Sequence, residues 1–221
     1  TIHGLNKVIS ELSQAQPQMR QVTDFITTYG MKTLFLKPTE MVRGSKKAKE
    51  LEEDITSYLN VPISKANGHW PVPSNTARRA NGYTALAWKH VVVKAKTGVN
   101  LNKIADITDL TNAVEAAILA LQAGKRQWSL SHIVRHYTDS GDHGGAIITW
   151  LHEMGHQVQF QAMRMEIPTP GLNESITTYS MQDTMEWHAE HFAAWALNRA
   201  MLETHYPAIV AYFDELMGEL L

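Results

Sequence analysis

The chain has 221 residues, and its 20 lysines and arginines nearly balance its 22 aspartates and glutamates, which leaves a net charge of −2. With 44% apolar and 19% charged residues, the composition is that of a globular protein and excludes a disordered or highly charged class. Near-neutrality argues against a general nucleic-acid binder, and no apolar run approaches the ~20 residues of a membrane-spanning helix. We therefore expect neither a nucleic-acid partner nor a membrane span.

Cysteine is absent, which excludes disulfides, thiol nucleophiles and cysteine-ligated metals. Histidine is abundant, with 11 copies, so any transition metal has to be held by imidazole and carboxylate groups. No secretory signal is recognisable at the start, and the first residue is Thr1, so a fragment or a processed product stays open. The sequence indicates neither the cellular location nor the oligomeric state.

Apolar residues at helical spacing predict two short helices near the start of the chain, over residues 5–12 and 22–29. Pro17, between them, can end the first helix or begin the next one, and Gly30 can terminate the second. Residues 31–36 then predict a short strand.

A charged helix is expected over residues 45–59, with both signs within helical reach of each other, as on a solvated face. Residues 60–82 are rich in Pro, Gly and Asn and predict a long loop. This loop is the one plausible boundary. It divides a helical N-terminal segment, residues 1–60, from the main domain of residues 61–221, on which the segment is expected to pack.

The middle of the chain mixes strand and helix patterns. Valine-rich residues 90–95 predict a buried strand, which is either an edge strand along which an extended peptide lies or a central strand of the core. Residues 106–123 predict a helix closed by Gly124, and residues 128–137 fit a strand or a helix equally well.

The C-terminal third predicts mainly helix. One helix is expected over residues 147–165, a shorter helical or turn segment over 173–181, and a long helix over 183–206. Asp183, with a glutamate three residues on, is a helix-capping arrangement. Pro207 interrupts this helix before a last amphipathic one.

Residues 152–156 read His-Glu-Met-Gly-His, an H-E-x-x-H sequence inside an apolar helical run. Residues four apart lie on one face of a helix, so His152 and His156 can reach one cation, and neutral imidazole suits Zn²⁺. Glu153 lies beside the pair and can take a proton from water without being a ligand. Chance predicts roughly 0.03 such matches in a chain of this composition. Gly155 leaves space for a neighbouring segment to approach closely.

A catalytic zinc needs a third protein ligand and an open position. Glu174 follows the histidines at an interval close to that of thermolysin-like and aminopeptidase-like zinc enzymes. Glu186 lies further on, at the start of the long helix, and Glu190 shares its face one turn later, where it can accept the outer N–H of a zinc histidine. Both candidates remain open on this reasoning, with Glu186 favoured.

Tyr179, six intervening residues and then the stretch Glu-Trp-His-Ala-Glu-His-Phe at 186–192 resemble the end of the catalytic domain of anthrax lethal factor and its zincin metallopeptidase relatives. There, downstream of H-E-x-x-H, a tyrosine is followed at this same interval by a Glu-aromatic-aromatic-Ala-Glu-x-Phe stretch. The resemblance covers about residues 147–196. The chain departs from it at His188, where the relatives carry an aromatic residue, and by a shorter interval between the two motifs.

The resemblance implies an α+β, mainly helical, zincin-like metallopeptidase fold with a small β-sheet and an active-site helix, and residues 61–221 would be its catalytic domain. It implies a Zn²⁺ cofactor, with Glu174 kept as the alternative third ligand. The zinc ligands would be His152, His156 and Glu186. Glu153 would be the general base, Tyr179 would stabilise the oxyanion, and Glu190 would orient a ligand histidine.

The implied function is that of a zinc-dependent endopeptidase acting on a protein or peptide substrate, through a zinc-activated water with Glu153 as base. A zinc amidase acting on a non-peptide substrate would use the same residues, and so would a zincin-fold structural or binding protein of a larger phage or toxin assembly. Tyr179 alternatively packs in the core with its hydroxyl at the surface.

The remaining histidines and tryptophans of this region are expected to be structural. His143 lies in a glycine-rich stretch and predicts a turn residue, while His188 and His191 are expected not to be ligands. The tryptophans expected in the core between the two motif helices are Trp150, Trp187 and Trp195.

Overall fold

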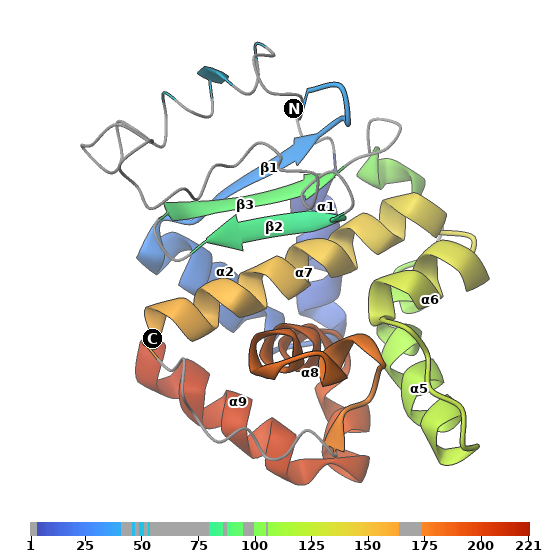
Figure 1. Ribbon diagram of the computed structural model, residues 1–221. Coiled ribbons are helices and arrows are strands. Elements are labelled where there is room, and N and C mark those ends of the chain that lie inside the picture. The colour runs from blue at the N-terminus through green and yellow to red at the C-terminus, as the bar shows by residue number, and fades with distance from the viewer. Residues whose placement is uncertain are drawn as a thin grey trace.

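A computed structural model of the protein describes residues 4–40, 46, 49, 50, 53, 80–85, 88–94, 100–104, 106–163 and 174–221. In this part of the chain the structure is mainly helical, with one small three-stranded sheet (Figure 1). This confirms the expected mainly helical α+β class. The helix predicted over 45–59 and the loop predicted over 60–82 lie largely outside the described residues.

The described helices follow the sequence patterns closely at most of their ends. Gly30 terminates α2 in a left-handed conformation with φ 63°, and Asp183 caps α8 by accepting a hydrogen bond from the Glu186 amide. Their bounds are α1 Leu5–Ala15, α2 Met19–Tyr29, α5 Thr108–Gln122, α6 Leu130–Tyr137, α7 Gly141–Gln161, α8 Thr184–His205 and α9 Pro207–Leu220, with short 3-10 turns η2 Leu101–Lys103 and η4 Tyr179–Met181.

The sheet has the order β1-β3-β2, with β1 Lys32–Leu36, β2 Gly82–Ala85 and β3 Trp88–Lys94. β1 pairs with β3 in parallel and β2 pairs with β3 in antiparallel orientation. Because β3 is flanked on both sides, Val91, Val92 and Val93 are fully buried. The central-strand alternative for this segment is therefore correct and the edge-strand alternative is wrong. Strand β1 also joins the N-terminal segment to the sheet of the main domain.

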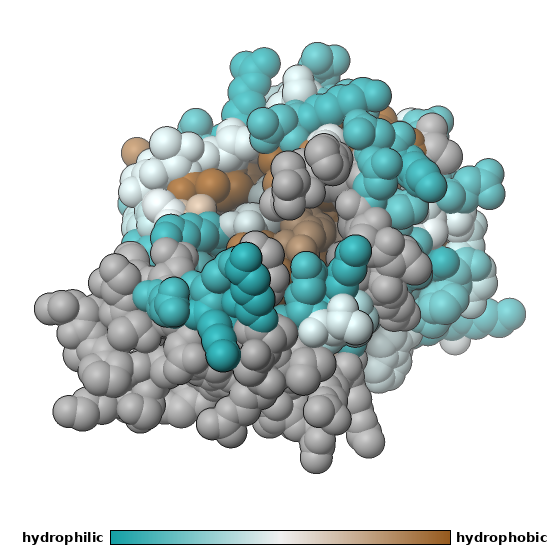
Figure 2. All heavy atoms as spheres, turned by 90° about the horizontal axis from the view of Figure 1, so that it is seen from above, coloured by the Kyte–Doolittle hydropathy of each residue, from teal (hydrophilic) through white to brown (hydrophobic). Residues whose placement is uncertain are grey.

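Helix α7 runs under the sheet, and the long described helices lie on this one side of it (Figure 1). Trp150 of α7 donates its indole N–H to the Thr33 hydroxyl of β1 at 3.0 Å, and Gln157 donates to Thr84 of β2 at 2.6 Å. These bonds hold the helix against both outer strands. On the opposite face of the sheet, hydrophobic atoms lie in a recess bordered by hydrophilic residues (Figure 2).

Helix α8 packs against the other side of α7, and Gly155 is the point of closest approach. A Cβ at this glycine would lie 2.8 Å from the Ala189 Cα and 3.0 Å from the Ala189 carbonyl oxygen, both backbone atoms. Glycine is therefore required if the two helices are to lie this close, as its place in the motif suggests. The close packing places the side chains of the first turn of α8 next to those of α7.

Two local expectations need correction. Helix α7 begins at Gly141 and not near residue 147, so His143 lies in a helix and not in a turn. Gly144 and Gly145 are packing residues, since a Cβ at Gly144 would meet Val134 at 2.7 Å and one at Gly145 would meet Arg135 at 2.3 Å. The ambiguous segment at 128–137 is a helix, α6, capped by the Ser129 hydroxyl.

The three tryptophans are buried as expected, but they do not fill the space between the motif helices. Trp150 points to β1, whereas Trp187 and Trp195 pack against Phe213 of α9, with ring centroids 6.4 and 6.2 Å away. Among the described residues, no helix combines the length and apolar character needed to cross a membrane.

Candidate metal centre

His152, His156 and Glu186 come together between α7 and the first turn of α8. Oε2 of Glu186 lies 2.9 Å from Nε2 of His152 and 3.6 Å from Nε2 of His156. The three ligand atoms all lie within 4.8 Å of one another. Two atoms that each lie about 2 Å from one tetrahedral ion are about 3.3 Å apart, so these separations match a shared cation.

The helix geometry explains why the carboxylate reaches the histidines. His152 and His156 are one turn apart on the same face of α7, with ring centroids 4.9 Å apart. Glu186 is held in the first turn of α8 because Asp183 caps that helix, and its amide donates to Asp183 Oδ1 at 2.8 Å. The close approach at Gly155 brings this turn to the face that carries both imidazoles.

Glu190 lies one turn further along α8 and faces the outer nitrogen of His152. Its Oε2 lies 3.1 Å from His152 Nδ1, while its Oε1 accepts hydrogen bonds from the Leu130 amide at 2.6 Å and the Thr177 hydroxyl at 3.2 Å. The side chain is 2% exposed, so all three donors act in a dry environment. Glu190 therefore fixes the ring of His152 and also joins α6 to the turn that carries Tyr179.

Glu153 and Tyr179 flank the metal group. Glu153 is buried on α7 next to β2, and a Cβ at Gly82 would lie 2.8 Å from its Oε1. Tyr179 lies with its ring centroid 5.5 Å from that of His152, and it lines the same pocket as Glu153.

The electrostatics of the site follow from burial and the clustered carboxylates. Burial raises the pKa of Glu153 above its ordinary value. Burial alone lowers the pKa of His152, but hydrogen bonds to Glu186 and Glu190 outweigh it and raise this pKa to about 10. Burial and nearby Glu186 raise the pKa of Tyr179, so its hydroxyl keeps its proton at neutral pH.

A pocket of about 250 Å³ opens beside His152 and Glu153. Apolar parts of its wall come from Trp128, Ile148 and Tyr179. Trp128 is 50% exposed, which is unusual for so large an apolar side chain, and its ring centroid lies 6.0 Å from that of Tyr179. The Tyr179 amide donates to the Trp128 carbonyl at 2.8 Å, so the two residues are held as one wall.

The other candidates of this region do not join the metal group. Within the described part of the chain, the group of possible ligands contains Glu186 and not Glu174. His188 is fully buried among aromatic rings of α9, and burial lowers its pKa to about 3. His191 accepts a hydrogen bond from the Ile176 amide and contacts the Trp187 carbonyl, so it holds the turn before Tyr179.

Several contributors to the site carry no signal in the sequence. Thr177 and the Leu130 amide contact Glu190, and Gly82 permits β2 to lie against Glu153. Trp128 and Ser129 line the pocket from a segment that is distant in sequence from both motifs. None belongs to a motif, so only the fold brings them to the site.

The donor set fits a catalytic zinc. Two neutral imidazoles and one carboxylate are the ligands that catalytic zinc sites use, and a carboxylate behind a ligand histidine is the usual orienting group. Comparisons of the chain with protein-family models, with curated proteins and with solved structures found no significant match. The chemistry of the site therefore stands on its geometry alone.

Proposed function

We propose that this protein is a zinc-dependent endopeptidase with a zincin-like fold, and that its site works like that of the lethal factor family that its motifs resemble. The observation that carries the proposal is the convergence of His152, His156 and Glu186, with the buried carboxylate of Glu153 beside them. A pocket opens next to these residues, so a substrate has access to them.

Zinc held by these three residues would lower the pKa of a coordinated water toward neutrality and polarise a substrate carbonyl. Glu153, with its raised pKa, would take the proton of the attacking water and return it to the leaving amine. The Tyr179 hydroxyl, protonated at neutral pH, would donate a hydrogen bond to the developing oxyanion. Glu190 would keep the His152 ring in place throughout.

Strand β2 is the element along which an extended peptide would lie. Within the described residues β2 is an outer strand that pairs with β3, and the proposal places the peptide along its other edge. Along an antiparallel strand, the backbone N–H and C=O groups of successive residues point alternately toward the partner strand and away from it. The Asn81 carbonyl accepts a hydrogen bond from the Lys94 amide of β3, so the N–H and C=O of Gly82 point away from β3. Gly82 lies against Glu153, so a peptide paired there would pass the proposed base.

The test is digestion of casein and of a random peptide library by the zinc-loaded protein, with and without a chelator. We expect cleavage that the chelator abolishes and that Glu153→Gln abolishes while zinc remains bound. An exposed glutamate on α8, Glu203, offers a matched control, because Glu203→Gln leaves the site intact and should keep full activity. Zinc binding without any peptide cleavage would contradict the proposal and favour a non-peptide amidase or a binding protein.

A further inference from the structure

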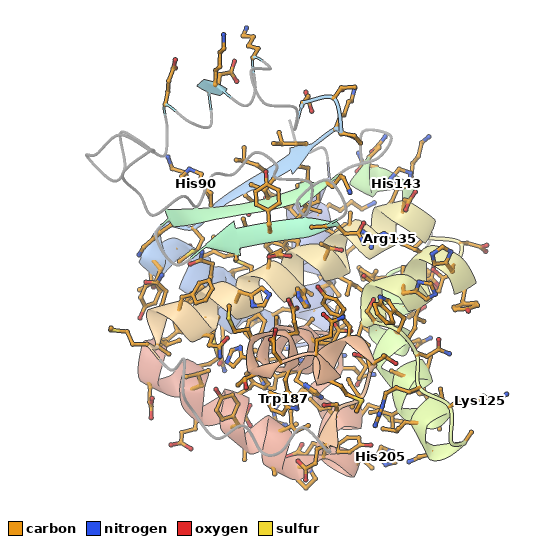
Figure 3. All side chains as sticks on the ribbon, in the orientation of Figure 1. His90, Lys125, Arg135, His143, Trp187 and His205 are labelled. Carbon is orange, nitrogen blue, oxygen red and sulfur yellow. The ribbon has the colours of Figure 1, made fainter. Side chains whose placement is uncertain are left out.

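A buried arginine lies behind the pocket, outside the residues that the proposed reaction uses. Arg135 comes from α6, and its side chain is only 8% exposed. Figure 3 places it near the end of the sheet where β2 begins, above α7. Its aliphatic stem fills the space that Gly145 leaves open, since a Cβ there would lie 2.3 Å from the Arg135 Cγ.

The two terminal nitrogens of Arg135 bond to hydroxyls of the pocket wall. Nη1 donates to the Ser131 hydroxyl at 3.2 Å and Nη2 donates to the Thr149 hydroxyl at 3.1 Å. Both Ser131 and Thr149 line the pocket that contains Glu153. The guanidinium therefore bonds to the hydroxyls of two residues that line the pocket.

The charge of Arg135 is only partly balanced by acidic groups. Its ion pair is with Asp142, at 3.5 Å from Nε, and that carboxylate is 43% exposed to water. Its two terminal nitrogens donate to neutral hydroxyls instead of carboxylates, although a guanidinium matches a carboxylate best. An arginine keeps its charge in proteins, so a positive charge, paired with Asp142, lies behind this end of the pocket.

The pocket has two ends of different character along α7. Glu153, Thr149 and Gly145 follow one another at four-residue intervals on one face of the helix, so successive levels are about 6 Å apart. Glu153 lies at the end of the pocket where the proposed reaction takes place. Arg135 contacts α7 at Thr149 and Gly145, one and two turns before Glu153. Glu190, the other carboxylate of the lining, already accepts from two donors and faces His152.

Of the two hydroxyls, that of Ser131 is the one that can donate to a ligand. The Thr149 hydroxyl already donates to the Gly145 carbonyl at 2.9 Å, but the Ser131 hydroxyl accepts from Arg135 and has only the Ser129 hydroxyl near it, at 3.3 Å. The Ser131 hydroxyl can therefore donate its proton either to Ser129 or to a ligand oxygen, and the arginine behind it polarises this hydroxyl.

We infer that this pocket is a specificity site that selects a substrate side chain carrying a carboxylate, glutamate or aspartate, next to the bond that is cut. The inference rests on the proposed peptidase function for its substrate class. The aliphatic stem of the side chain lies between Trp128 and Ile148, and the carboxylate meets the Ser131 hydroxyl with the Arg135 charge behind it. The residue missed by sequence reasoning is thus Arg135, which acts through Ser131.

The first experiment measures binding without turnover or metal. The metal-free protein is titrated with three N-acetylated, C-methylamidated amino acids, those of glutamate, glutamine and leucine, and the indole signal of Trp128 is followed by NMR. We expect the glutamate derivative to bind about tenfold more tightly than the other two, as one charge-assisted hydrogen bond allows. Equal or tighter binding of the leucine derivative overturns the inference.

Variants separate specificity from stability. Arg135→Met should remove the preference for glutamate over glutamine, and Ser131→Ala should reduce it severalfold. Arg20→Met, which removes an exposed arginine of α2, should leave it unchanged. Because Arg135 is buried and its loss can impair folding, Ser131→Ala decides the matter if Arg135→Met does not fold; an unchanged preference in Ser131→Ala then overturns the inference.

The second experiment reads the residues on both sides of every bond cut in the peptide library. We expect glutamate and aspartate to be enriched at one position next to the cut bond, and the enrichment to fall severalfold in Ser131→Ala. Selective binding of the glutamate derivative with no cleavage contradicts the proposed function and leaves the pocket assignment standing. Cleavage with apolar residues at both positions contradicts the pocket assignment alone.

Discussion

Nδ1 of His152 lies 3.1 Å from Oε2 of Glu190, while Nε2 of the same ring lies 2.9 Å from Glu186. One imidazole is thus held between two carboxylates, of which one shares the proposed ion and the other fixes the ring. Glu190 also accepts from the Leu130 amide and the Thr177 hydroxyl. The ligand histidine, α6 and the turn before Tyr179 therefore depend on one buried side chain.

Replacing this carboxylate should weaken zinc binding. Glu190→Gln keeps the shape but loses the charge that supports His152, and we expect a loss in zinc affinity of about 10–100-fold. Competition with a chromophoric chelator measures it, with Glu203→Gln as the exposed control on the same helix. An unchanged zinc affinity would show that Glu190 has no orienting role.

Tyr179→Phe should lower turnover without removing the metal. The hydroxyl is the proposed donor to the oxyanion, and loss of one such donor costs roughly 10²–10³ in kcat. Zinc content, measured on the same samples, should not change. Tyr137→Phe, at an exposed tyrosine of α6, is the control and should behave as the wild type. Equal activity of the two variants would remove Tyr179 from the mechanism.

Gly155→Ala should destabilise the protein, because the added methyl group meets the backbone of Ala189 at 2.8 Å. We expect a loss of about 1–3 kcal/mol in the free energy of unfolding, measured by denaturant titration. Gly218 in α9 is a matched control, since nothing lies within 4 Å of a Cβ there. Gly218→Ala should gain roughly 0.5–1 kcal/mol from helix propensity. A neutral Gly155→Ala would mean that α7 and α8 do not pack this closely.

The metal-free protein should become less stable as the pH rises above 6.5. The pKa of His152 is raised to about 10 in the fold by Glu186 and Glu190, against the burial that lowers it, and is 6.5 ordinarily. The folded state therefore binds more protons than the unfolded state between these values, and the stabilisation present below pH 6.5 is lost on the way to about pH 10.

Zinc has to displace the proton of His152, so the apparent zinc affinity should rise between pH 6.5 and about pH 10. In the zinc-loaded protein, the loss of stability that comes from this proton should disappear. Thermal melting from pH 6 to 9.5, with and without zinc, measures both effects. A metal-free melting temperature that rises across this range would contradict the assignment of His152.

The sequence predicts the site better than it predicts the surroundings of the site. His152, Glu153 and His156 are set by helical spacing within one element, and Asp183 fixes the start of the helix that carries Glu186. Such local rules survive folding because neighbours along a helix keep their geometry. The wrong start of α7 has the opposite cause, since its glycines make contacts with α6 that no local pattern records.

Strand placement shows the same limit. A run of valines predicts a buried strand at β3 but does not say whether neighbours lie on one side or both, and the pairing with β1 decides this. Likewise Arg135 and Trp128 reach the pocket only because α6 packs on α7. Residues brought to a site by tertiary contacts alone carry no motif.

The most direct test of the account is the zinc content of the purified protein and its dependence on the three ligands. After loading and exhaustive dialysis, we expect one zinc per chain, with an X-ray absorption spectrum of two imidazole nitrogens and additional oxygen ligands at about 2.0–2.1 Å. His156→Ala and Glu186→Ala should each lose the ion, whereas Glu174→Ala should keep it. A protein that retains no zinc, or that retains it equally in all three variants, would contradict the metal centre and the function built on it.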